Sequence, residues 1–428
     1  MVHSPDSSLS SAPILLRARI VLPVAGPLIE NGAVLVAGNQ IASVGPWSAV
    51  RSKTQASATD LGEVILLPGL INAHCHLDYT GMAGQIASPS SFSDWIKALL
   101  ALKAHWTYSD FSLSWLQGAR MLLAHGATTV ADIEAVPELL PEVRTATPLR
   151  VCSLLEMTGV RRRRVPRQVL NEALERIHAL PPGANWAGLS PHAPYSTTPE
   201  LLRLSALTAR QRGWLVATHV SESSEEFDMF VHGTGPMFEW LKGQRDTADC
   251  GKGSPIAHLE RQGLLAENLL AIHANYLAPG DADLLGQAGA SVVHCPRSHE
   301  YFGHAPFPRA ELAKAGVNLC LGTDSLASVR SAPGEKVELD LRAEMRVFSQ
   351  REPSLSPDAV LELVTIRAAE ALGMAGKLGQ LSEGALADLI VIPFDRAARE
   401  ASEALIQHKG PVSGAMIDGR WVLGPSSL

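Results

Sequence analysis

The sequence predicts an α/β fold, a (β/α)8 TIM barrel, together with a small β-sandwich domain formed from both chain ends. Its 428 residues suit a barrel of roughly 250–300 residues plus a smaller domain. The middle of the chain alternates apolar, strand-like runs with amphipathic stretches, whereas both ends hold short apolar runs separated by turn residues. We therefore expect residues 1–66 and 380–428 to form the β-sandwich, and residues 67–379 to form the barrel.

The two chain ends are predicted to form short strands. Gly26-Pro27 and Gly38-Asn39 are dipeptides that favour tight turns, and they interrupt the N-terminal apolar runs. Because both ends carry the same pattern, we expect them to pack together with the barrel inserted between them. The runs rich in Val, Ile and Leu are residues 13–23, 32–45, 387–392 and 414–419.

The barrel strands are predicted from eight apolar runs without polar alternation. Strands of a parallel sheet are buried on both faces and therefore need such runs. They are residues 64–73, 127–133, 150–156, 186–190, 214–219, 269–273, 290–294 and 317–322. Helices are expected between them, at residues 167–179, 199–212, 259–266 and 307–315.

Composition narrows the class of protein. Hydrophobic residues make up 46% and charged residues 18%, a balance typical of a folded core. The net charge of −7 without a dominant basic tract argues against a nucleic-acid partner. No signal peptide and no membrane-spanning run is predicted, and the five scattered cysteines are expected to be reduced thiols. We expect a cytoplasmic protein with a small-molecule substrate, and leave open whether it forms a homo-oligomer.

A His-x-His pair ends the first barrel run. Side chains alternate along a strand, so His74 and His76 should share the face that points into the barrel mouth, with Cys75 pointing away. Imidazole is the commonest ligand of zinc-like metals. By itself the pair is weak evidence for a metal site.

Three further runs end in residues of the metal-ligand type: His219, His273 and Asp324. Barrel active sites are built from the C-terminal ends of the strands, so these side chains should converge with the His-x-His pair. The alternative is a set of polar core residues, each of which would need a buried hydrogen-bond partner of its own. Four converging ligands favour a metal centre.

The ordered set Pro68-Gly69-Leu70-Ile71-Asn72-Ala73-His74-Cys75-His76, His219, His273 and Gly322-Thr323-Asp324 resembles the amidohydrolase superfamily. It is most similar to the branch of mononuclear-metal deaminases and chlorohydrolases. The likeness covers nearly the whole chain, including the C-terminal Gly379 to Leu389 segment. It implies that His74, His76, His219 and Asp324 bind the metal, and that His273 orients the bound water or the substrate.

One divalent metal ion is expected. A binuclear site normally needs a lysine at the end of a middle strand, and neither residues 151–156 nor residues 188–192 contain one. The ligand types favour Zn²⁺, with Fe²⁺ as the alternative.

Glu222 lies three residues after His219, the spacing of the proton-shuttling glutamate in the deaminase branch. Attack on an aromatic carbon that bears an amino group requires protonation of a ring nitrogen and of the leaving amine. A desolvated glutamate can carry that proton because burial raises its pKa. Since Glu225 and Glu226 follow closely, an acid at the protein surface or at a helix N-terminus is the alternative.

The resemblance also implies substrate contacts. His192 would face a ribose or a ring substituent, or else support its proline-rich loop. Asp94 and Trp95 resemble the acid–tryptophan pair with which nucleoside-type deaminases cover their substrates, although Trp95 could equally be helix core.

Some residues depart from the family pattern. His299 replaces the usual asparagine of Cys-Pro-x-Ser-Asn, a variant similar to sequences grouped near aminofutalosine deaminases. The role of His304 is left open. Arg161 to Arg164 either bind an anionic substrate group or form a solvated run.

The expected function is that of an aminohydrolase, a hydrolase acting on carbon–nitrogen bonds other than peptide bonds. We expect it to deaminate an aminated heterocycle, a purine-nucleoside-like compound such as aminofutalosine or an adenosine derivative. The metal lowers the pKa of its water towards ~7, His273 and Asp324 accept the proton, hydroxide attacks, and Glu222 protonates the ring nitrogen. The alternatives are a triazine-type chlorohydrolase or a (cyclic) amide hydrolase using the same site, and a non-catalytic relative without metal.

Overall fold

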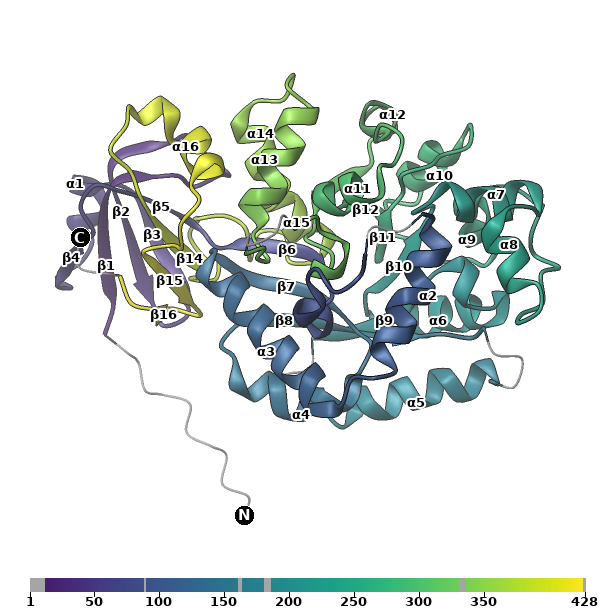
Figure 1. The fold of residues 1–428 in the computed structure, drawn as a ribbon. Helices are drawn as coiled ribbons and strands as arrows, with labels where there is room; N and C mark the ends of the chain where they lie inside the picture. Colours follow the sequence, from purple (N-terminus) through teal and green to yellow (C-terminus); the bar gives the residue numbers. More distant parts are fainter. Residues whose placement is uncertain (1–11, 88–89, 161–163, 181–185, 332–335, 426–428) are drawn as a thin grey trace, which may run out of the picture.

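A computed structural model describes residues 12–87, 90–160, 164–180, 186–331 and 336–425. Two β-sheets dominate the architecture, a parallel barrel and a separate mixed sheet beside it (Figure 1). This confirms the predicted barrel and the predicted β-rich unit made from both ends. Arg161, Arg162 and Arg163 of the arginine run lie outside the described residues.

The barrel contains eight parallel strands, in the order in which they occur along the chain. All eight predicted runs contribute one strand. The first and last strands lie side by side, and the Thr323 amide donates to the carbonyl oxygen of His74 at 3.0 Å. The barrel is therefore nearly closed. The strands are β6 (Leu70–Cys75), β7 (Ala127–Glu134), β8 (Arg150–Met157), β9 (Ala187–Pro191), β10 (Val216–Val220), β11 (Leu269–His273), β12 (Ser291–His294) and β13 (Asn318–Leu321).

The mixed sheet joins the two ends of the chain. Its order is β16-β15-β14-β5-β1-β2-β3, with β4 beside β1. β5 and β14 are antiparallel neighbours, so strands from the two ends pair directly. The bounds are β1 (Ile14–Val21), β2 (Ile29–Ala37), β3 (Gln40–Pro46), β4 (Ala58–Asp60), β5 (Val64–Pro68), β14 (Leu389–Pro393), β15 (Gly414–Ile417) and β16 (Arg420–Leu423).

The apolar run at residues 64–73, expected as one strand, serves both sheets. β5 belongs to the mixed sheet and β6 to the barrel, with Gly69 between them. A Cβ atom at Gly69 would lie 2.1 Å from Oγ1 of Thr128, so only glycine fits this crossing. β5 continues to Pro68 in the mixed sheet, and the exact division between the two domains stays a proposal.

Helices flank the barrel strands. The prediction at residues 199–212 agrees with the observed helix, and the one at 167–179 differs by one residue at each end. The helix expected at 259–266 instead runs from Pro255 to Arg261, because Ser254 caps its start and Gly263, with φ +71°, follows its end. The helices of this part of the chain include α2 (Phe92–Lys103), α3 (Tyr108–Ala124), α5 (Pro166–His178), α6 (Pro199–Arg212), α7 (Ser224–His232), α8 (Pro236–Leu241), α9 (Pro255–Arg261), α11 (Pro296–Phe302), α12 (Arg309–Lys314) and α13 (Leu341–Arg351).

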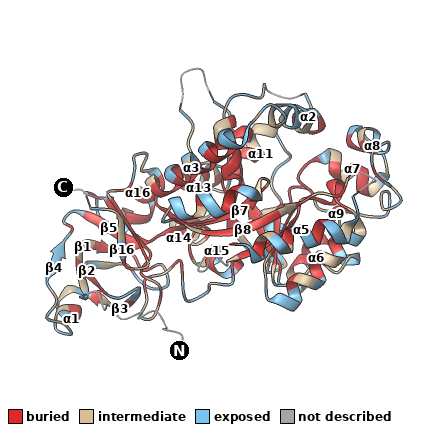
Figure 2. Ribbon diagram, turned by 90° about the horizontal axis from the view of Figure 1, so that it is seen from below, coloured by how far each residue is buried: buried red, intermediate tan, exposed pale blue. Residues whose placement is uncertain are grey.

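The buried residues concentrate in the strands, while α5 and α6 turn exposed residues outward (Figure 2). The barrel strands contribute nearly continuous buried segments, as a sheet covered on both faces requires. Within the described ranges, no helix combines the length and apolar character needed to cross a bilayer.

Candidate active site

The C-terminal ends of β6, β10 and β13 bring the four proposed metal ligands together. The Nε2 atoms of His76 and His219 are 3.2 Å apart. Oδ1 of Asp324 lies 3.5 Å from Nε2 of His74 and 3.8 Å from Nε2 of His76. The four side chains therefore aim at one small volume in the barrel mouth, as their positions at strand ends predicted.

The chemistry of these side chains fits a divalent metal. Both ring nitrogens of His74 and Nδ1 of His76 are buried and have no hydrogen-bond partner within the described residues. Nδ1 of His219 lies 2.9 Å from the carbonyl oxygen of His192, so it carries the proton and leaves Nε2 as the free lone pair. Three imidazoles and one carboxylate are a donor set typical of zinc-like ions.

A clasp between the first and last strands positions two of these ligands. Asn72 donates to Oγ1 of Thr323 at 2.8 Å and accepts from the Thr323 amide at 3.1 Å. A Cβ atom at Gly322 would lie 2.8 Å from the carbonyl oxygen of His74, so a larger residue would push β6 and β13 apart. The clasp and this glycine hold His74 next to Asp324.

Left-handed backbone conformations are concentrated at the site. Ser221, His273, Ala274 and Asp324 have φ values of 50°, 74°, 48° and 53°. Non-glycine residues adopt such values at a cost, and they persist where the surrounding structure enforces them, often at active sites. Here they lie at the ends of β10, β11 and β13, where each strand turns its last side chains into the mouth.

Asp324 is oriented by hydroxyl groups. Ser298 and Ser328 donate to its Oδ2 at 2.7 and 2.9 Å, which leaves Oδ1 facing the imidazoles. Burial works to raise the pKa of Asp324, but the His74 imidazole 3.5 Å away and the imidazoles of His273 and His76 hold that pKa well below its usual range. The side chain is therefore a carboxylate.

Glu222 and His273 form a pair beside Asp324, with Oε1 and Nε2 3.4 Å apart. Burial, followed by the charges of Asp324 and Glu226, raises the pKa of Glu222 well above its usual range. Burial likewise lowers the pKa of His273 well below its usual range. A protonated Glu222 and a neutral His273 are thus the favoured forms.

The backbone of Glu222 is held in place by hydrogen bonds. Its amide donates to the Glu226 carboxylate at 2.9 Å, and Asn275 donates to its carbonyl oxygen at 2.9 Å. Nδ1 of His299 lies 3.1 Å from Oδ1 of Asn275. His299, the residue that departs from the family pattern, therefore acts on Asn275 and lies outside the cavity lining.

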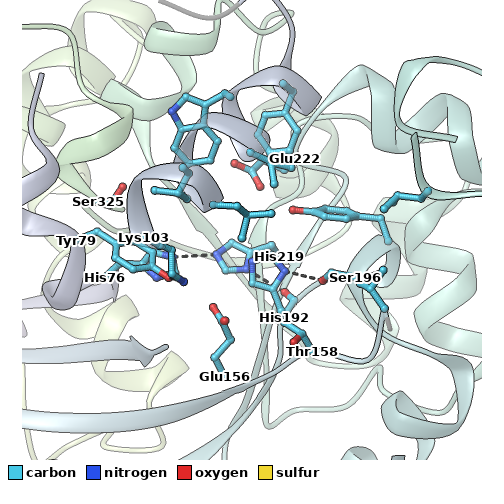
Figure 3. Close-up of a pocket in the computed structure, with 18 of the residues that line it drawn as sticks. His76, Tyr79, Lys103, Glu156, Thr158, His192, Ser196, His219, Glu222 and Ser325 are labelled. Carbon is cyan, nitrogen blue, oxygen red and sulfur yellow. Dashed lines mark hydrogen bonds between the residues drawn. The ribbon is translucent and has the colours of Figure 1, made fainter. Parts of the chain in front are cut away.

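A cavity of about 440 Å³ opens over these groups (Figure 3). Its floor is polar and carries the imidazoles and carboxylates described above. Its outer wall is apolar and comes mainly from α2 and α8, with Phe92, Trp95, Ile96, Leu99, Leu100, Trp240 and Leu241. The arrangement suits a flat polar group at the floor attached to a less polar remainder.

The predicted substrate contacts separate into two classes. His192 lines the cavity, with Nδ1 2.7 Å from the Ser196 hydroxyl, and burial lowers its pKa to about 3. Trp95 also lines the cavity and is buried. Asp94 lies on the outer face of α2, where it accepts from Ser90 and pairs with Lys97. Its predicted contact with the substrate stays a prediction.

Among the cavity residues that were not predicted, Tyr79, Lys103 and Glu156 carry polar or charged groups. The ring of Tyr79 stacks on His76, with centroids 5.3 Å apart, and Lys103 hydrogen-bonds to its hydroxyl. Glu156 lies at the end of β8. The reasoning from strand ends that identified the proposed metal ligands could therefore also have found it. Lys103 ends a helix and gives no such signal.

His304 and Arg164 complete the set of residues whose roles the sequence left open. The hydroxyl of Tyr276 lies 3.3 Å from Nδ1 of His304. Arg164 lines the cavity at its rim and pairs with Glu172 at 3.0 Å.

Comparisons with known proteins agree with this geometry. Residues 65–422 match the model of the Amidohydrolase family. The chain is 30% identical to the 5-methylthioadenosine/S-adenosylhomocysteine deaminase of Syntrophobacter fumaroxidans, over 97% of this chain and 93% of the relative.

Solved structures share the fold. The aminofutalosine deaminase of Helicobacter pylori, in complex with methylthio-coformycin, superposes with a TM-score of 0.82 at 20% identity, covering 95% of this chain and 99% of that one. The atrazine chlorohydrolase of Arthrobacter aurescens, complexed with zinc, gives a TM-score of 0.80 at 22% identity, covering 96% and 95%.

Proposed function

Because the chain belongs to the amidohydrolase family, we propose that it catalyses the hydrolytic deamination of an adenosine-like nucleoside. It is a hydrolase acting on carbon–nitrogen bonds other than peptide bonds. The observation that carries the proposal is the Glu222–His273 pair, 3.4 Å apart and next to Asp324 on the cavity floor. Relatives that align over nearly their whole length are named as deaminases of adenosine derivatives, which supports the choice of substrate class.

His74, His76, His219 and Asp324 are the proposed ligands of one divalent ion. Zinc is the proposed metal, because the donor set suits it and the chlorohydrolase of the same fold was crystallised with zinc. When bound, such an ion supplies Lewis-acid activation of water near neutral pH.

The protein groups supply the proton transfers. His273, neutral because it is buried, and the Asp324 carboxylate lie where they can accept a proton from the attacking water. Glu222 carries a proton and can donate it to a ring nitrogen of the substrate, then help protonate the departing amine. The sum of these steps adds water across a ring C=N bond, then breaks the bond between that carbon and its amino group, and releases ammonia.

The rest of the cavity positions the substrate. His192 is neutral and its ring faces the floor from β9, so it can accept or donate one hydrogen bond to the substrate. The apolar wall of α2 and α8 excludes bulk water from the floor, which strengthens the electrostatic interactions there.

Dechlorination of a triazine is the second candidate, supported by the fold shared with the atrazine chlorohydrolase. It would use the same floor with a different leaving group. The two candidates differ in what leaves the ring, chloride or ammonia.

A release assay tests the proposal. The purified protein with zinc would be offered adenosine, 5′-methylthioadenosine, S-adenosylhomocysteine, aminofutalosine, adenine and atrazine, with ammonia and chloride measured. We expect ammonia from at least one adenosine nucleoside. Chloride from atrazine, with no ammonia from any nucleoside, would contradict deamination and favour the second candidate.

A further inference from the structure

The cavity has a third carboxylate, that of Glu156, which the proposed reaction does not use. Figure 3 shows Glu222 and Glu156 on opposite sides of the His76–His219 pair. Glu222 faces His273, whereas Glu156 makes no hydrogen bond or ion pair with any of the residues that the structure describes. Its two oxygens are therefore available to a ligand in the cavity.

A lysine lies near this free carboxylate. Lys103, the last residue of α2, hydrogen-bonds to the Tyr79 hydroxyl, and its ammonium lies 4.5 Å from the centre of the Tyr79 ring. Because Tyr79 stacks on His76, one aromatic ring separates Lys103 from the metal site. Glu156 lines the same cavity as Tyr79 and Lys103, and Figure 3 draws it below Lys103 and His76. Glu156, Lys103 and Tyr79 thus form one polar corner of the cavity.

The charges of this corner restrict what it can bind. A carboxylate alone would favour a cation and an ammonium alone would favour an anion, but the two together are neutral. They offer two acceptor oxygens and an ammonium that has two donor hydrogens besides the one it gives to Tyr79. Neighbouring hydroxyl groups match this pattern, because each donates one hydrogen and accepts through its oxygen.

The carboxylate expected from the family resemblance does not reach this corner. Asp94 is paired with Ser90 and Lys97 on the far side of α2, and its side chain is 51% exposed. Glu156 consequently offers the cavity a carboxylate free of protein partners among the described residues, on the opposite side of the His76–His219 pair from Glu222.

We propose that Glu156 and Lys103 bind the vicinal 2′,3′-diol of a ribonucleoside, and so select ribonucleosides over dideoxynucleosides and free bases. The inference rests on the proposed function and names its substrate class. The amino-bearing ring would lie on the metal-site floor between Glu222 and His192. The ribose would lie one ring width away, at the polar corner, with its remaining substituent against the apolar wall.

The test compares adenosine with 2′,3′-dideoxyadenosine as substrates of the zinc-loaded enzyme. Hydrogen bonds to charged groups are strong enough that losing the diol should lower kcat/KM by about 10–100-fold in the wild type. Glu156→Gln should lower kcat/KM for adenosine by a similar factor, chiefly through KM, because the contact is remote from the reacting carbon. For dideoxyadenosine, the kcat/KM of this variant should stay within a few-fold of the wild-type value. The variant should also keep about one metal ion per chain. Lys103→Met should show the same pattern.

Glu138→Gln is the matched control. It removes a carboxylate that is 51% exposed, paired with Arg176 and outside the cavity lining. This variant should keep the wild-type kcat/KM for both substrates. Asp94→Asn tests the rival assignment. If it abolishes the preference for adenosine and Glu156→Gln does not, the inference is overturned.

Two other outcomes also overturn the inference. One is equal kcat/KM for adenosine and dideoxyadenosine in the wild type. The other is an equal loss of kcat/KM for both substrates in Glu156→Gln, which would indicate a structural role. Absence of ammonia from every nucleoside would show in the wild type before any variant is made. That result would remove the proposed function, and the inference with it.

Discussion

Two groups of buried ionisable side chains lie at the mouth of the same barrel, and they differ in what satisfies their polar atoms. The metal-site group consists of His74, His76, His219, Glu222, His273 and Asp324. The acid cluster consists of Asp78, Asp132 and Glu134. Both groups are buried, and both contain residues with strongly shifted pKa values, among them Glu222 and Asp132.

Protein donors surround the acid cluster. Asp132 accepts from the Leu77 amide at 2.8 Å and from the Trp115 indole at 3.0 Å. Glu134 accepts from the same indole at 3.3 Å and from the Ser153 hydroxyl at 2.7 Å. One indole N–H therefore bridges two carboxyl groups. Burial is the main reason that the pKa values of all three acids are raised.

The metal-site group is satisfied differently. Buried nitrogen atoms of its imidazoles have no hydrogen-bond partner among the described residues, and His76, His219 and His273 line the cavity, whereas no member of the acid cluster lines it. Oδ1 of Asp78 is the one unpartnered oxygen of the acid cluster among the described residues. Buried charge alone thus does not identify a reactive site; buried atoms that are unpartnered and face a cavity do. Substitutions in the first group should change the reaction, and those in the second should change stability.

The largest expected effect follows from removing a ligand. His219→Ala should release or weaken the metal and lower turnover by ~10³-fold or more, because a metal contributes several kcal/mol to the transition state. Elemental analysis of wild type and variant checks this, and we expect about one ion per wild-type chain. Two tightly bound ions in the wild type would contradict a mononuclear site.

The next effect concerns Glu222. Glu222→Gln keeps the size of the side chain but cannot transfer a proton, so turnover should fall ~10²–10⁴-fold with the metal retained. Ammonia release and metal content would be measured on the same preparation. Near-full activity would show that Glu222 is not the proton shuttle, and the deaminase and chlorohydrolase proposals would then stand equal.

A substitution in the acid cluster should leave the chemistry alone. Trp115→Phe removes the bridging N–H and leaves Asp132 and Glu134 without a shared donor, which should cost about 1–3 kcal/mol of unfolding free energy. Denaturant unfolding measures this, and kcat should stay within about twofold. Trp106→Phe is the matched control, because the Trp106 indole donates no hydrogen bond within the part of the chain described. Equal destabilisation by both variants would refute the bridging role.

The smallest effect is in the pH dependence of stability. Burial raises the pKa of Glu134 to about 7, against the opposing influence of Ser153, Arg144, Trp115 and Asp132. A glutamate in the unfolded chain ionises near pH ~4.3. Between these values the folded state binds more protons at Glu134, so the contribution of Glu134 to stability is fully present below pH ~4.3 and is lost as the pH rises through about 7.

Glu134→Gln cannot ionise and should therefore lose less stability than the wild type between about pH 5 and 8, by on the order of 1–3 kcal/mol. Melting temperatures at several pH values, taken as differences from the wild type, cancel the titrations that both proteins share. Glu172→Gln changes an exposed acid and serves as the control. Its melting temperature should vary with pH as that of the wild type does. A parallel pH profile for Glu134→Gln would mean that Glu134 is ionised in the folded protein.

Much of the site could be predicted because strand ends converge in any parallel barrel. Each of five site residues lies at the end of an apolar run: His74, His76, His219, His273 and Asp324. Their positions along the sequence were therefore enough to predict that they meet at one end of the barrel. No knowledge of loops or helix orientation was needed.

The cavity contacts made by α2 could not be predicted in the same way, because they depend on which face of the helix points inward. Trp95, Leu99 and Lys103 are four residues apart, share one helix face and line the cavity. Asp94, one residue from Trp95, is rotated by a quarter turn and faces solvent. The motif Asp-Trp identified the helix but did not show which of the two side chains faces inward.

The pairing of β5 with β14 affects how this chain is made. Translation adds about 5–20 residues per second, so the roughly 320 residues between Pro68 and Leu389 take about 15–60 s to synthesise. Throughout that time β5 has β1 on one side and an open edge on the other. An open edge can accept a strand from a neighbouring nascent chain. The mixed sheet can therefore be completed only after all the barrel strands have been synthesised.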